Sequence, residues 1–190
     1  MRYELQVSKR HLPIVGLLGL VVVAAAGGSV YYYQFVVPHN ASCGVSVHRL
    51  IFMTAIIQEM GGFNITNEVI LTSGSAPTAS GANPPSLVGL QYQNVTVTDH
   101  KTIIANLGDS VTIYVKSINA NSTVQLSGAT GHGFELDQYG ILDTNIPWGN
   151  WHTMPTFTAT AGGPFRYNCA QVCSAKHSDM VGTFSAGCSA

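Results

Sequence analysis

Residues 169–180 carry four side chains that can bind a metal ion, in the spacing C-x3-C-x3-H-x2-M. Thiolate, imidazole and thioether groups are soft or borderline donors, and this mixture favours copper over magnesium or calcium. One thiolate is enough for a single blue-copper ion, whereas a pair of nearby thiolates can each bridge two copper ions. The spacing therefore predicts a copper site that contains Cys169, Cys173, His177 and Met180.

Two other interpretations of the cysteine pair are open. Cys169 and Cys173 could form a disulfide, but His177 and Met180 would then have no role. The same thiolates could hold a zinc ion, although methionine is rarely a zinc ligand.

A single loop cannot complete a copper centre, so a second imidazole must come from elsewhere in the chain. The candidate is His132, which stands between two glycines, 37 residues before Cys169. That distance is enough for two or three strands to cross a small barrel. The His132-Gly-Phe motif and the 169–180 run together resemble the binuclear copper-A domain of subunit II of haem-copper terminal oxidases. The HGF form and Gln171 are most similar to the branch in which subunit II has one transmembrane helix.

The resemblance implies which groups hold two copper ions. Two thiolates would bridge both ions, and each ion would take one imidazole and one weaker donor. Many relatives have a glutamate at the position of Gln171 that helps to hold magnesium; an amide is a poorer ligand for that hard cation, so we expect no magnesium there. The implied ligands are the bridging Cys169 and Cys173, His132 with Met180 on one copper, and His177 with the Gln171 backbone carbonyl on the other.

The resemblance also implies a function, the electron-input subunit of a membrane-bound terminal oxidase. Such a subunit accepts single electrons from an external donor, a cytochrome c or a small blue-copper protein. It passes them to a haem in subunit I, which reduces oxygen, so the oxygen chemistry lies in another subunit. The expected partners are subunit I, other oxidase subunits, the donor and membrane lipid. Relatives place an aromatic side chain near the copper as the point of electron input, and Trp148 and Trp151 are the candidates here.

The rival interpretation is a membrane-tethered electron carrier with one blue-copper ion. The second cysteine argues against it, because one thiolate usually suffices for that centre.

The composition is apolar and poor in charge. Hydrophobic residues make up 46% of the chain and charged residues 9%, well below the usual quarter. The net charge is −1 and no Lys/Arg-rich run appears, so nucleic-acid binding has no support. The low charge and four Asn-x-Ser/Thr sequons favour an archaeal source; the sequons begin at Asn40, Asn64, Asn94 and Asn121.

Residues 13–37 contain no charged side chain and predict a transmembrane helix. Such a helix would be roughly 37 Å long, enough to span a bilayer with some tilt. Arg2, Lys9 and Arg10 precede it, so the positive-inside rule places residues 1–12 in the cytoplasm and the copper domain outside the cell. A cleaved signal peptide is the alternative, but the apolar run continues too far for one.

Residues 38–86 are expected to be a membrane-proximal segment and a linker. The apolar run 50–57 is too short to span a membrane, and we expect a short helix that lies on the membrane or on a partner subunit. A strand pair with residues 63–71 is the alternative. Residues 72–86 are rich in Ser, Ala, Gly and Pro and predict a loop without regular structure.

Residues 87–190 are expected to form the copper domain. Apolar and polar residues alternate there over short runs, which predicts half-buried strands of an antiparallel sandwich. A tight turn is expected at Gly108. Together with the resemblance, this predicts a mainly β cupredoxin-type Greek-key β-sandwich behind one N-terminal transmembrane helix. The alternating runs are residues 95–98, 111–116, 124–126, 157–159 and 165–169.

Cys43 and Cys188 are the two cysteines that remain once the copper ligands are assigned. Both follow the apolar segment, and an even remainder in an oxidising compartment suggests a disulfide between them.

Overall fold

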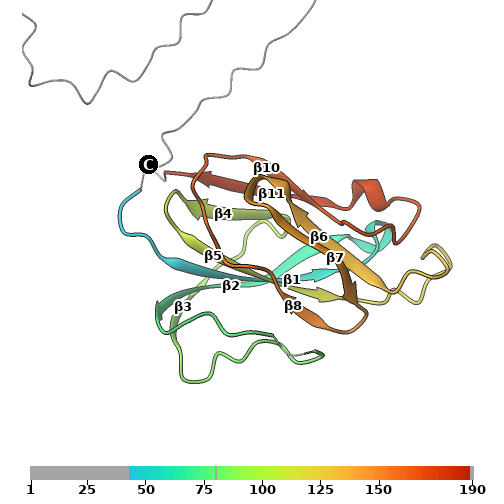
Figure 1. Cartoon of the computed structure of the whole chain (residues 1–190), viewed down its shortest axis with the longest axis horizontal. Helices are drawn as coiled ribbons and strands as arrows, with labels where there is room; N and C mark the ends of the chain where they lie inside the picture. The colour runs from blue at the N-terminus through green and yellow to red at the C-terminus, as the bar shows by residue number, and fades with distance from the viewer. Residues whose placement is uncertain (1–42, 80, 189–190) are drawn as a thin grey trace, which may run out of the picture. The chain divides into compact units, whose positions relative to one another are not determined.

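Short runs of alternating apolar residues form two β-sheets that pack face to face (Figure 1). The computed structural model describes residues 43–79 and 81–188. The first sheet has the order β3-β2-β1-β5-β8, with β9 also paired to β5, and the second has the order β4-β11-β10-β6-β7. The predicted mainly β sandwich is confirmed.

The strands of the first sheet are β1 (His48–Ala55), β2 (Phe63–Ser73), β3 (Gln91–Val95), β5 (Ser110–Ser117), β8 (Trp151–Thr153) and β9 (Phe157–Thr158). Those of the second are β4 (Thr102–Asn106), β6 (Gly131–Leu136), β7 (Ile141–Pro147), β10 (Phe165–Asn168) and β11 (Val181–Gly187). Three short 3-10 helices connect them: η1 (Gln58–Met60), η2 (Asp137–Tyr139) and η3 (His177–Asp179).

Both sheets are mixed, so the expectation of a purely antiparallel sandwich is wrong. β1 runs parallel to β5, and β4 runs parallel to β11. The turn at Gly108 connects β4 to β5, which belong to different sheets, so it is not a hairpin. Sequence alternation identifies half-buried strands but does not say which neighbour each strand pairs with, or in which direction.

Residues 50–57 are not the expected helix, because most of them lie in β1. The strand alternative is the correct one, since β1 pairs along its length with β2. β1 also lies between β2 and β5 in the middle of the first sheet, so the domain begins well before residue 87. The run reads as continuously apolar because β1 is buried on both faces: Ile51 and Met53 face the inner core, whereas Leu50 and Phe52 face an outer cluster.

The segment that was predicted to be a linker packs on the outer cluster of the first sheet. Side chains from residues 74–90 cover the outer face of the first sheet, where Leu50, Phe52 and Tyr114 are buried. The Tyr114 hydroxyl donates a hydrogen bond of 2.7 Å to the Pro77 carbonyl oxygen. The described residues of this segment, 74–79 and 81–90, form no strand, as predicted for a loop. They pack on the sheet and do not link two separate domains.

The inner core lies between the two sheets and is rich in aromatic rings. Phe63 of β2 packs edge-on against Phe134 of β6, with ring centroids 5.8 Å apart, and against Tyr167 of β10 at 5.3 Å. All three side chains are fully buried, and such edge-to-face contacts add to the hydrophobic contribution of burial.

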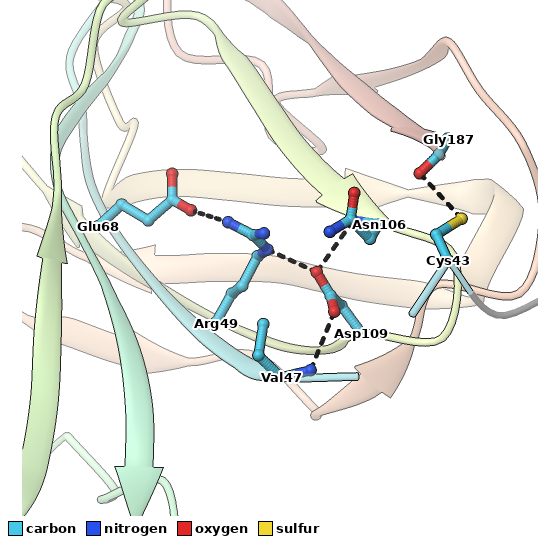
Figure 2. Close-up of polar contacts among 7 residues, drawn as sticks. All are labelled: Cys43, Val47, Arg49, Glu68, Asn106, Asp109 and Gly187. Atoms are coloured by element: carbon cyan, nitrogen blue, oxygen red, sulfur yellow. Dashed lines mark hydrogen bonds and ion pairs between the residues drawn. The ribbon is translucent and has the colours of Figure 1, made fainter. Parts of the chain in front are cut away.

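An ionic cluster holds one end of the parallel β1/β5 pair (Figure 2). The fully buried Asp109 accepts hydrogen bonds from Arg49 Nε at 2.6 Å and from the backbone N–H groups of Val47 and Asn106. Arg49 also donates to Glu68 at 2.7 Å. The cluster therefore connects β1, β2 and the β4–β5 turn.

Cys43 lies next to this cluster (Figure 2) and forms a disulfide with Cys188. The Cys43 N–H donates to the Leu107 carbonyl oxygen at 3.1 Å, so the bridge joins the end of β11 to the β4–β5 turn as well.

Two predicted strand segments differ from the structure. Val124 and Leu126 lie in the connection between β5 and β6, where their side chains are 45% and 42% exposed. β3 ends at Val95, so Val97 lies beyond it.

Within residues 43–79 and 81–188, no helix is long and apolar enough to cross a membrane. The predicted transmembrane segment, residues 13–37, lies outside the described residues.

Candidate metal site

Three of the predicted ligands come together in the interior of the sandwich. The donor atoms of His132, Cys169 and Cys173 all lie within 4.8 Å of one another, and the three side chains are buried. His132 Nδ1 is 3.9 Å from Cys169 Sγ. Cys169 and Cys173 are free thiols, so the structure does not contain the alternative disulfide between them.

β6 positions His132, and the glycine that follows it, Gly133, allows the ligand loop to approach. The His132 N–H donates to Ser117 Oγ of β5 at 3.2 Å, which fixes the strand at the histidine. A β-carbon on Gly133 would lie 2.8 Å from Ala170 Cβ and 2.9 Å from the Ala170 nitrogen. Only glycine therefore leaves room for the loop backbone beside β6.

The loop between β10 and β11 is anchored at both ends. The Cys169 N–H, at the start of the loop, donates to the Met180 carbonyl oxygen, at its end, at 3.1 Å. In its middle, the Leu126 N–H donates to the Cys173 carbonyl oxygen at 3.0 Å, so the β5–β6 connection runs alongside the loop. These backbone contacts orient both thiols towards His132.

The two thiols share one proton network. A hydrogen bond from the Cys173 thiol lowers the pKa of Cys169, and contacts with His132 and with the Gly133 N–H, 3.3 Å from the sulfur, act in the same direction against the effect of burial. The same contact raises the pKa of Cys173, and burial adds to that rise. The contact between the two thiols therefore favours ionisation of Cys169 over that of Cys173, and binding a metal through both sulfurs would release protons.

Unpaired polar atoms lie around these residues, but the His132 nitrogen that faces a thiol is Nδ1, 3.9 Å from Cys169 Sγ, and not the unpaired Nε2. His132 Nε2 is buried and has no hydrogen-bond partner among the described residues, as is true of His177 Nδ1 and Ser174 Oγ. Buried polar groups are normally paired, so such orphaned atoms need an explanation. Two soft sulfurs and an imidazole in an enclosed space form a donor set suited to copper or zinc.

The other three predicted ligands lie nearby but do not all join this group. The Gln171 carbonyl oxygen is 3.2 Å from Cys169 Sγ. Met180 is fully buried in the inner core. His177, at the start of η3, is half-buried and lies outside the three-residue group.

The two tryptophans differ in their relation to the site. The Trp148 ring packs edge-on against His132 with the centroids 4.8 Å apart, and its Nε1–H donates to the Ala129 carbonyl oxygen at 3.1 Å. Trp151 lies in β8, where it packs against Phe52 of the outer cluster. Trp148 is therefore the tryptophan that contacts the site.

Two residues that contact the site backbone carry no recognisable signal in the sequence. Ser117 binds the His132 backbone, and Glu59 of η1 accepts a hydrogen bond of 3.2 Å from the Lys176 N–H inside the ligand loop. Neither belongs to a motif, and Glu59 is 117 positions away from its partner. The glycines that flank His132 are the one local signal that a second segment passes close by.

Comparison with protein-family models and with curated proteins finds no match to this chain. The structure thus establishes a β-sandwich with a buried group of one histidine and two cysteines that could bind a metal, consistent with a copper-binding electron carrier.

Proposed function

We propose that this chain is the electron-input subunit II of a membrane-bound haem-copper terminal oxidase, with a cupredoxin-type sandwich that holds a binuclear copper-A centre. The observation that carries the proposal is the buried group of His132, Cys169 and Cys173, with the Gln171 carbonyl oxygen beside the first thiol. His177 and Met180 complete the proposed ligand set from the same loop.

Two thiolates that bridge two coppers spread one unpaired electron over both, so bond lengths change little on reduction and electron transfer is fast. The chain contributes rigidity: β6 holds His132, the anchored loop holds the sulfurs, and the inner core excludes water. Second-shell contacts of this kind tune metal affinity and potential.

In this proposal electrons arrive from an external cytochrome c or small blue-copper protein, by way of Trp148 rather than Trp151, because Trp148 contacts a proposed ligand. They leave for a haem in subunit I, where oxygen is reduced. Residues 13–37 anchor the chain in the cell membrane with the copper domain outside. Tags at the two ends, probed on intact and lysed cells, test that topology; an N-terminal tag accessible on intact cells would reverse it.

The second candidate is a membrane-tethered carrier with one copper ion. The specific observation in its favour is that three donors lie together while His177 lies outside the group. Copper analysis and electron paramagnetic resonance of the copper-loaded full chain separate the two. Two coppers per chain and a seven-line hyperfine pattern support the binuclear centre; one copper and a four-line pattern support the single-ion carrier.

A further inference from the structure

A side chain from the other sheet reaches into the ligand loop. Glu59 belongs to η1, which joins β1 to β2 in the first sheet, and its Oε1 accepts the Lys176 N–H at 3.2 Å. Lys176 lies between Cys173 and His177. We propose that Glu59 is a positioning residue, which fixes the stretch between these two ligands and places a negative charge beside the metal centre. The inference rests on the proposed function for the identity of the metal.

Backbone hydrogen bonds close the turn that presents Glu59. Ile57, just before η1, is fully buried, and the Ile56 N–H donates to the Gly62 carbonyl oxygen at 3.1 Å. Gly61 and Gly62 have φ values of 125° and 73°, which glycine adopts without strain and which return the chain directly into β2. The backbone therefore fixes the Cα of Glu59, and the hydrogen bond with the Lys176 N–H orients its carboxylate.

The contact made by Glu59 complements the other anchors of the loop. The Leu126 N–H and the Arg166 guanidinium hold loop carbonyls, at Cys173 and Ser178 respectively. Glu59 instead accepts an N–H from the middle of the loop. The loop's own turns use different groups: the His177 N–H donates to Ser174 and the Met180 N–H to His177. Without Glu59, the Lys176 N–H loses this acceptor and the stretch before His177 loses its connection to the first sheet.

The charge of Glu59 is retained at this position. Burial acts to raise the pKa of Glu59, but hydrogen bonds from its own N–H and that of Lys176, with the nearby Ser174 hydroxyl, bring the pKa below its usual value. Its second oxygen, Oε2, is buried, and neither it nor the Ser174 hydroxyl makes a hydrogen bond of good geometry in the described chain. A fixed anion favours the more positive oxidation state of a nearby metal, so it lowers the reduction potential.

Two substitutions separate position from charge. Glu59→Gln keeps an oxygen that can accept the Lys176 N–H but removes the charge, and Glu59→Ala removes both. The matched control is Asp137→Asn, which alters an exposed carboxylate in η2, another three-residue 3-10 helix. All are made in the full chain, with thermal unfolding to verify the fold.

In the metal-free protein we expect the Lys176 amide to exchange hydrogen faster in Glu59→Ala than in wild type, with protection restored in Glu59→Gln. After copper loading, chelator competition should show about 10-fold or greater loss of affinity in Glu59→Ala. Glu59→Gln should bind nearly normally but with a raised reduction potential. Asp137→Asn should change none of these.

Unchanged exchange and affinity in Glu59→Ala would overturn the positioning role. An unchanged potential in Glu59→Gln would overturn the charge role, and this variant decides the matter even if Glu59→Ala does not fold. If the wild-type chain binds only one copper, the binuclear centre is refuted. The role of Glu59 would still be supported if Glu59→Ala bound that single copper more weakly.

Discussion

Two buried polar clusters occupy opposite ends of the parallel β1/β5 pair, and they differ in how their hydrogen bonds are satisfied. At one end Asp109 has three donors, including Arg49, and forms a complete network. At the other end, beyond Ser117, His132 Nε2 has no partner among the described residues. A complete buried network specifies structure, whereas an incomplete one costs stability unless something else binds. We therefore infer that the Asp109 cluster stabilises the fold, whereas the group around His132 binds a ligand.

The sharpest test of this contrast is Cys173→Ser. We expect a fall in copper affinity of about 100-fold or more, because a hydroxyl replaces a thiolate, and, for the proposed binuclear centre, loss of its delocalised spectrum. The unfolding free energy of the metal-free protein should change by no more than about 1 kcal/mol. Copper titration and urea unfolding measure the two effects. Ser178→Ala, an exposed site in the same loop, is the control; intact copper binding in Cys173→Ser would remove the thiolate pair from the site.

Asp109→Ala should have the opposite profile. Removing the Asp109 carboxylate leaves the half-buried Arg49 with only Glu68 as a charged partner, and two backbone N–H groups lose an acceptor. Breaking a buried pair in this way costs about 3–5 kcal/mol. Urea unfolding should show that loss, while copper content at low temperature stays at the wild-type level. A loss below about 1 kcal/mol would mean that the cluster does not anchor the fold.

The disulfide lies at the Asp109 end of the β1/β5 pair, so we expect its removal to lower stability and to leave copper binding unchanged. Replacing Cys43 and Cys188 together by serine removes a cross-link between positions 145 residues apart. We expect a loss of about 2–4 kcal/mol in unfolding free energy, since the unfolded chain gains freedom. The copper spectrum should not change. A variant that folds normally but binds copper poorly would show that the two ends are coupled.

The smallest expected effect on stability comes from a change at Tyr114, which lies outside both polar clusters. Burial raises its pKa to about 12, and its hydroxyl donates to Pro77. The unfolded phenol ionises near 10.0, so stability from this group is complete below that pH and declines as the pH rises towards the folded value.

Tyr114→Phe should therefore cost about 1 kcal/mol at neutral pH and lose less stability on alkalinisation than wild type. Urea unfolding at neutral pH and across the alkaline range measures both the loss of stability and its pH dependence. Tyr92→Phe, an exposed tyrosine on β3, is the control; parallel pH profiles for wild type and Tyr114→Phe would contradict the expectation.

The metal-binding residues could be predicted because they belong to short motifs in the sequence. Cys169 and Cys173 belong to one loop whose spacing is visible in the sequence, and His132 stands out between two glycines. Alternation likewise predicted β10, whose two faces differ in burial, and β5, where the sequence alternates although both faces are buried. The placement of His177 and Met180 as further ligands stays a prediction that copper stoichiometry tests.

By itself, the sequence determined the β class of the domain and the three donors of the site, because both follow from residue type and short spacing. The tertiary structure decided what long-range packing controls. β1 looked like a short helix because residues 74–90 bury its outer face and mask the alternation. Trp148 rather than Trp151 contacts His132, and Glu59 reaches Lys176 from another sheet. Such contacts depend on how the sheets pair and stack, which no local pattern in the chain records.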